Sequence, residues 1–241
     1  MKNVSRLRLA IALSICVLGI GCADSTTPTD ETKVQIYTQM DATTITPYKI
    51  KDGNPSIKAK GVTADSMHIT RVRVLVSNMK MHMSKEDINY DGHNVKTGPF
   101  LVTIDATGQY LFASSQIPYG IYDHIKFEIH KFSNDEVASY INDVVYSDFV
   151  TGDRYTVIID GTVYNAGVAY PYQYKSNVTV NLKLKFDKDL DFILNSTNEI
   201  IFAVNPSLIF KSGLSILDPR DPNNSNDIDN GIKSAFHALK K

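Results

Sequence analysis

Apolar and polar residues alternate along most of the chain from residue 33 onward. The clearest example is residues 121–130, where apolar side chains are separated by polar ones and where Tyr122 and His124 fall on the polar face. A period of two is typical of a strand with one buried face. The same alternation predicts strands at residues 33–40, 67–83, 100–105, 155–160, 162–168, 178–186 and 200–205.

Short turn sequences separate these predicted strands. Asp160-Gly161 stands between two of them and is typical of a two-residue hairpin turn. Half-buried strands joined by short turns indicate antiparallel sheets with one face on the core and one face exposed to solvent. We therefore predict a mainly β fold, an antiparallel β-sandwich of immunoglobulin or transthyretin type, with a closed barrel as the alternative.

The period changes near the C-terminus. Residues 218–224 are rich in Asp, Pro and Asn, and apolar residues then recur at helical spacing from Ile228 to Leu239. This spacing predicts a short amphipathic helix over residues 226–240. Because Gly231 costs this helix about 1 kcal/mol relative to alanine, we expect it to be stabilised by docking on the sandwich.

The first residues have the pattern of an export signal. Three basic residues precede an apolar run, residues 9–20, that is too short to span a bilayer comfortably. The next segment, Leu18-Gly19-Ile20-Gly21-Cys22, resembles the bacterial lipobox, in which small residues precede a cysteine that receives diacylglycerol. The resemblance implies a signal peptide over residues 1–21 and lipid attachment at Cys22. An ordinary signal peptide or an uncleaved anchor would also export the rest of the chain.

Composition after Cys22 indicates a tether followed by one domain. Residues 22–32 contain no large apolar side chain and predict a flexible tether. Residues 33–241 have the length and apolar content of a single β-sandwich domain that includes the C-terminal helix. The other cysteine, Cys16, lies within the signal, so the domain has no disulfide and depends on core burial.

Charge and missing motifs narrow the classes of function. Loss of Lys2, Arg6 and Arg8 with the signal changes the formal net charge from −1 to −4. An acidic chain without a Lys/Arg cluster argues against nucleic-acid binding. The chain has none of the common hydrolase, metalloprotease, P-loop or dinucleotide motifs. We therefore predict a protein that is not an enzyme and that has no cofactor.

One segment resembles the start of a calcium-binding loop. Asp87, Asn89 and Asp91 supply oxygen ligands at alternate positions, and Gly92 follows them. Position twelve of that loop is Gly98, however, and carries no carboxylate. We favour a polar hairpin turn, with a weak calcium site as the alternative. The Asp/Asn-rich turn at residues 218–229 is a weaker candidate for calcium.

Two rows of side chains are further candidates for binding. Met79, Met81 and Met83 would project from one face of a strand at about 7 Å spacing. Thioethers are soft ligands that bind Cu(I), although methionines at such positions more often fill a core, which is the interpretation we favour.

The histidines His124 and His130 are too far apart to chelate one ion, and we predict that both lie at the surface.

Tyrosines form the second row. Tyr170, Tyr172 and Tyr174 alternate, so their rings should share one face, with Tyr164 nearby. An exposed aromatic row can stack on sugar rings. Packing against a neighbouring strand is the alternative that we favour.

Several segments together resemble a known family. The strings Ile69-Thr70-Arg71-Val72-Arg73-Val74-Leu75-Val76-Ser77 and Ile117-Pro118-Tyr119-Gly120-Ile121-Tyr122-Asp123-His124-Ile125 resemble bacterial envelope lipoproteins grouped as domain of unknown function 4382. Residues 172–176, 205–210, 216–219 and 232–236 are similar to uncharacterised lipoproteins of the same kind of bacteria. The resemblance implies a sandwich-like domain outside the cytoplasm and brings no catalytic residues.

These observations predict a lipoprotein of the bacterial cell envelope, lipid-anchored and either periplasmic or surface-exposed. Its domain would be a non-enzymatic binding or structural module for a carbohydrate or an envelope protein. The alternative is an assembly subunit resembling fimbrillins, in which strand 33–40 would lie at a free edge and be able to leave. A metal-binding domain or an unrecognised hydrolase ranks third.

Overall fold

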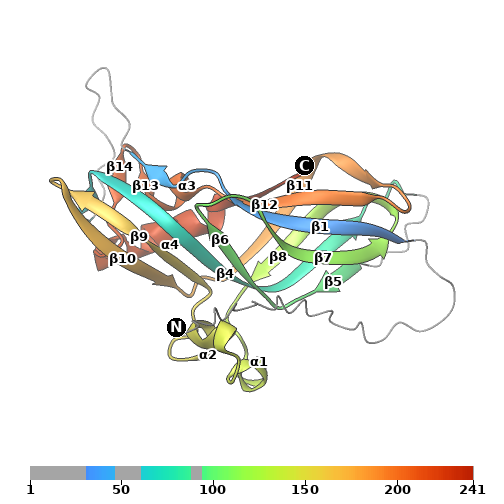
Figure 1. Ribbon diagram of the computed structural model, residues 1–241, viewed down its shortest axis with the longest axis horizontal. Helices are drawn as coiled ribbons and strands as arrows, with labels where there is room; N and C mark the ends of the chain where they lie inside the picture. The colour runs from blue at the N-terminus through green and yellow to red at the C-terminus, as the bar shows by residue number, and fades with distance from the viewer. Residues whose placement is uncertain (1–30, 47–60, 88–93, 241) are drawn as a thin grey trace, which may run out of the picture.

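The computed structural model describes residues 31–46, 61–87 and 94–240. This part of the chain is mostly β, and its strands form the predicted antiparallel β-sandwich (Figure 1). The predicted signal peptide, Cys22 and most of the tether lie outside the described residues. Glu31 and Thr32, which we assigned to the tether, instead begin the first strand, where Thr32 is buried and pairs with Ile117.

Two large sheets and one small sheet make up the fold. The four-stranded sheet has the order β15 (Phe236–Lys240), β12 (Thr197–Val204), β1 (Glu31–Met40) and β7 (Tyr110–Pro118). The eight-stranded sheet has the order β10 (Val168–Ser176), β9 (Val157–Asn165), β4 (Ser66–Met83), β8 (Gly120–Ile129) and β11 (Val180–Phe192), and β2 (Thr44–Ile45), β5 (Asn94–Thr97) and β6 (Phe100–Asp105) also pair with β4. The small sheet joins β13 (Lys211–Ser212), β14 (Ser215–Leu217) and β3 (Thr63–Ala64).

Short helices pack on both faces of the large sheet. The helices are α1 (Asn134–Tyr140), α2 (Ser147–Val150), α3 (Pro206–Phe210) and α4 (Ser225–Ala235), with 3-10 turns η1 (Val144–Tyr146) and η2 (Pro222–Asn224). Figure 1 shows α4 beside β9 and β10 at one end of the molecule, and β1, β7 and β12 at the other end. The fold is therefore a sandwich at one end and a sheet packed on helices at the other.

Strand β4 connects these two ends, because its 18 residues run through both of them (Figure 1). Its first half pairs with β9 and β6, and its second half pairs with β8 and β5. Val74 belongs to the main core, whereas its neighbour Leu75 packs with Phe132 and Phe149 on the other face. Both side chains are fully buried, so this strand is covered on both faces.

Strand β1 departs from a purely antiparallel arrangement. It pairs in parallel with β12 and antiparallel with β7, so this first strand lies inside the four-stranded sheet. Both of its hydrogen-bonding edges are therefore used. The predicted fimbrillin-like free edge at residues 33–40 is not present.

The C-terminal helix is shorter than predicted. Helix α4 ends at Ala235, and the next five residues form strand β15 rather than the rest of a helix over residues 226–240. The Phe236 ring stacks on Phe202 with ring centroids 5.3 Å apart, and the backbone of β15 pairs with β12. Pairing with β12 and burial of the Phe236 ring together stabilise a strand here, although the side chains have helical spacing.

The predicted hairpin turn at Asp160-Gly161 is also wrong, because both residues lie in the middle of β9. The chain turns at Ala166-Gly167, where both residues have positive φ, 50° and 77°. Positive φ at both central residues is what a tight two-residue hairpin turn requires. The residues predicted as two strands on either side of Gly161 are therefore one strand.

Candidate functional site

The tyrosine row lies on one face of β10, but most of it is inside the protein. Tyr172 and Tyr174 are buried, and both rings approach Phe210 of α3 edge-on, with centroids 6.0 and 6.5 Å from it. The structure thus favours packing over sugar stacking for these two tyrosines. Tyr164 pairs with Ala169 and lies on the opposite face of the sheet from Tyr170.

The buried phenol of Tyr174 holds helix α4 against strand β10, whereas that of Tyr172 is bonded to β4. The Tyr174 hydroxyl donates to Asp229 Oδ1 at 2.9 Å, and Ser176 donates to the same oxygen at 2.7 Å. The Tyr172 hydroxyl donates to the Met67 sulfur at 3.2 Å. Burial raises the pKa of both tyrosines well above the usual range, so both remain protonated donors.

Tyr170 is the exposed member of the row, with 39% of its surface accessible. The Arg220 guanidinium lies over its ring, 4.3 Å from the centroid, in cation–π geometry. The same guanidinium is also bound to Asp218. An arginine therefore already occupies a face of this ring that a sugar would need.

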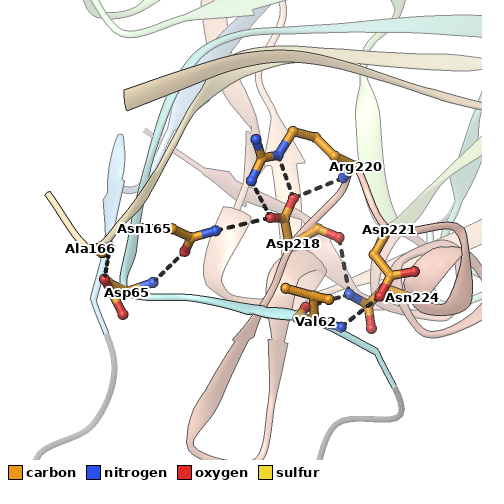
Figure 2. Close-up of polar contacts among 8 residues, drawn as sticks. All are labelled: Val62, Asp65, Asn165, Ala166, Asp218, Arg220, Asp221 and Asn224. Carbon is orange, nitrogen blue, oxygen red and sulfur yellow. Dashed lines mark hydrogen bonds and ion pairs between the residues drawn. The ribbon is translucent and has the colours of Figure 1, made fainter. Parts of the chain in front are cut away.

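A polar cluster next to Tyr170 joins three segments that are distant in sequence (Figure 2). The buried Asp218 carboxylate accepts hydrogen bonds from Arg220, at 2.6 and 3.0 Å, and from Asn165 at 3.3 Å. The Asn165 side chain in turn accepts from the Asp65 backbone, while Ala166 donates to the Asp65 carboxylate. We call Asp65, Asn165, Asp218 and Arg220 the aspartate clasp.

The clasp neutralises Asp218 and fixes the end of β14. Burial raises the pKa of Asp218. The hydrogen bonds and the charge of Arg220, with the bond from Asn165, lower it by more in total, so the pKa lies below its usual range. Beside the clasp, Asn224 donates to the carbonyls of Val62 and Asp218, and Asp221 accepts from the Val62 amide (Figure 2). These carboxylates are already engaged by protein donors. The structure favours a structural role over a calcium site in the turn at residues 218–229.

Only one of the three residues of the predicted calcium loop is described. Asn89 and Asp91 lie outside the described residues. Asp87 is buried, and its carboxylate accepts a hydrogen bond from the Ile121 amide at the start of β8. Its carboxylate thus points into the fold. Within the described ranges, no group of three His, Cys, Asp or Glu residues is placed to hold a metal ion.

The methionine row belongs to the hydrophobic core. Met79 and Met81 are buried in the main cluster, and Met83 packs against it. Their thioethers are surrounded by apolar side chains. This placement agrees with the favoured interpretation that the row fills the core.

The structure reveals a histidine pair that the sequence did not indicate. His82 of β4 and His124 of β8 face each other across the strands, and their rings stack with centroids 4.1 Å apart. His124 is only 7% exposed, so its predicted place on a solvated face is wrong. His124 lies opposite His82 in regular register, on the face that alternation predicted, and the His82 ring covers it there. The register shift beside Asp123 comes after this pair and turns Tyr122 into the core.

The environment of this pair disfavours positive charge. His124 Nδ1 is bonded to Asp123, but the Nε2 atoms of both rings are buried with no partner in the described part of the chain. Burial, His124 and Lys126 lower the pKa of His82 to about 4, although Asp123 opposes them. Burial, with the charges of Lys183 and Lys126, also lowers the pKa of His124, although Asp123 opposes them. Both rings are therefore neutral at pH 7.

Acid should destabilise the protein through this pair. Between about pH 6.5 and pH 4 the unfolded chain binds a proton at His82 that the folded chain does not, so stability falls as pH falls through this window. The His82 ring is half-buried, so water screens part of the effect, and we expect a loss of about 1–2 kcal/mol. Urea unfolding at a series of pH values measures it.

Replacement of both histidines by glutamine should flatten that part of the pH profile. His130→Gln provides the matched control, because His130 lies outside the stack and should leave the slope unchanged. An equal slope in the double variant and the wild type would contradict the assignment to this pair.

Comparison of the chain with models of known protein families, with curated proteins and with solved structures found no match to any of them. The resemblance to envelope lipoproteins therefore stays a prediction.

Proposed function

We propose that this chain is a lipid-anchored binding protein of the bacterial cell envelope, without catalytic activity of its own. The lipobox-like segment ending at Cys22 supports the anchor. Strand β1 begins at Glu31, and the few residues between them span at most about 30 Å when extended. The domain would therefore sit close to the membrane surface.

A groove between the two large sheets is the observation on which the binding role depends. It has a volume of about 350 Å³ and lies where β11, at the edge of one sheet, approaches β15, at the edge of the other. Small-molecule sites are concave, mostly apolar and of about 300 Å³ or more. The groove has these properties, with four apolar and three lysine side chains as its lining: Lys185, Phe186, Lys188, Leu190, Ala238, Leu239 and Lys240.

The groove supports a small ligand better than the other ligands that the sequence suggested. A carbohydrate would have relied on the tyrosine row, of which only Tyr170 is exposed. The fimbrillin-like alternative would have relied on release of β1, which is paired on both sides.

Cys22→Ser tests the anchor. We expect the wild type to appear in the membrane fraction and to incorporate a palmitate analogue, and the variant to lose the label and leave that fraction. Cys16→Ser is the matched control, because Cys16 lies in the predicted signal peptide and should not affect labelling. Label retained by the Cys22→Ser protein, or a soluble wild type that keeps Met1, would contradict the proposal.

A further inference from the structure

The shape of the groove comes from an irregularity in β11. Lys185 pairs with His124, and the next paired residue is Leu190, which lies opposite Tyr122. Residues 186–189 therefore have no regular partners on β8 and bulge away from the strand. Strand β15, the other wall, is at the edge of its own sheet.

Apolar side chains give the groove its floor. Leu190 is buried, and Phe186 and Ala238 are partly buried against the main core. Leu239 is 46% exposed and belongs to the same groove. This lining is continuous with the core of the sandwich, so an alkyl chain would extend a surface that is already apolar.

Three lysines give the groove its charge. Two other cations of the described chain are bound to carboxylates, in the pairs Lys80–Glu128 and Arg73–Asp148. In the part of the chain that the structure describes, Lys185, Lys188 and Lys240 form no ion pair. The carboxylates of Asp189 and Asp191, on the same strand, do not line the groove. Among the side chains that the structure describes, the three lysines of the groove thus have no carboxylate counter-ion.

We propose that this groove binds a single-chain anionic amphiphile of the fatty-acid type. The alkyl chain would lie along Phe186, Leu190 and Leu239, and the headgroup would lie among the lysines. The small volume fits one chain rather than a two-chain phospholipid. This inference rests on the proposed binding function and names its class of ligand.

Calorimetric titration of the mature chain, residues 22–241 with Cys22→Ser to prevent acylation, tests the proposal. The probes are dodecanoate and dodecyltrimethylammonium, both below their micelle concentrations. We expect dodecanoate to bind one molecule per chain and at least about tenfold more tightly than the cation. Binding should weaken at about 0.5 M salt, because salt screens the lysines.

Two kinds of variant test the assignment to this groove. Reversal of all three charges, Lys185→Glu, Lys188→Glu and Lys240→Glu, should weaken dodecanoate binding by about tenfold or more. Ala238→Phe should weaken it by filling the slot, without changing any charge. Lys85→Glu is the matched control, because Lys85 is an exposed lysine that does not line the groove, and it should bind like the wild type. Melting curves establish that each variant is folded.

The results that would overturn this ligand proposal can be told apart from a result against lipid attachment at Cys22. Equal binding of the anionic and cationic probes would overturn the role of the lysines, and no binding of either would overturn the ligand class. Phosphatidylglycerol vesicles that bind the wild type and the Ala238→Phe protein equally, with no dodecanoate binding, would place the interaction on a surface instead. Each result leaves the labelling of Cys22 to be judged separately.

Discussion

Gly161→Ala is expected to lower the free energy of unfolding by about 3 kcal/mol, measured by urea denaturation. A Cβ atom at this position would lie 2.5 Å from the His68 carbonyl oxygen and 2.8 Å from the Tyr172 ring. Real Cβ atoms do not approach backbone this closely, so β4 and β9 would have to separate. The loss is at the high end for overpacking because one of the two contacts is backbone and cannot rotate away.

The register explains why the space is so tight. Ile69 pairs with Gly161 and Arg71 pairs with Asp160, so Thr70 is an extra residue on β4 opposite the glycine. On the other side, Tyr172 pairs with Gly161, and its ring covers the position where a side chain would be. Glycine is thus required by close approach rather than by an unusual φ.

Thr162→Ala is the matched control. It removes a half-buried side chain from the next position of β9 and should cost less than about 1 kcal/mol. If Gly161→Ala were no more destabilising than this control, the strands would not be packed as the structure shows them.

The strands with several buried side chains could be predicted, and a strand with almost none could not. Strand β6 occupies the predicted residues 100–105, and β4 extends the predicted range by one residue. Strand β7 was missed because Ile117 is its one buried side chain, so it shows no clear alternation. An edge strand held mainly by backbone hydrogen bonds leaves little pattern in the sequence.

Irregular pairing explains most of the remaining errors. Asp160-Gly161 resembles a turn in sequence, but its glycine accommodates the extra residue on β4. The register shift beside Asp123 moves Tyr122 from its predicted polar face into the core. His124 is buried instead by its cross-strand stack on His82, which alternation could not predict. The groove between β11 and β15 depends on a bulge in β11 and on a strand that was predicted as helix, so its lysines could not be grouped from the sequence.

Phe202→Ala is expected to lower the free energy of unfolding by about 4 kcal/mol. Phe202 is fully buried in β12, and its ring lies 4.5 Å from Phe127 of β8 and 5.3 Å from Phe236 of β15, measured between centroids. The ring therefore joins the two sheets and holds the C-terminal strand. Its loss leaves a cavity that the two facing rings cannot fill without moving their strands.

Leu111→Ala distinguishes this effect from the loss of any apolar side chain. Leu111 lies in β7 of the same sheet but is 49% exposed, so its removal should cost less than about 1 kcal/mol. The C-terminal strand offers a second readout, because amide exchange at residues 236–240 should accelerate in Phe202→Ala and not in Leu111→Ala. Equal exchange in the two variants would mean that backbone pairing with β12 alone holds β15. Residues 236–240 would then form a strand rather than a helix without any contribution from Phe202.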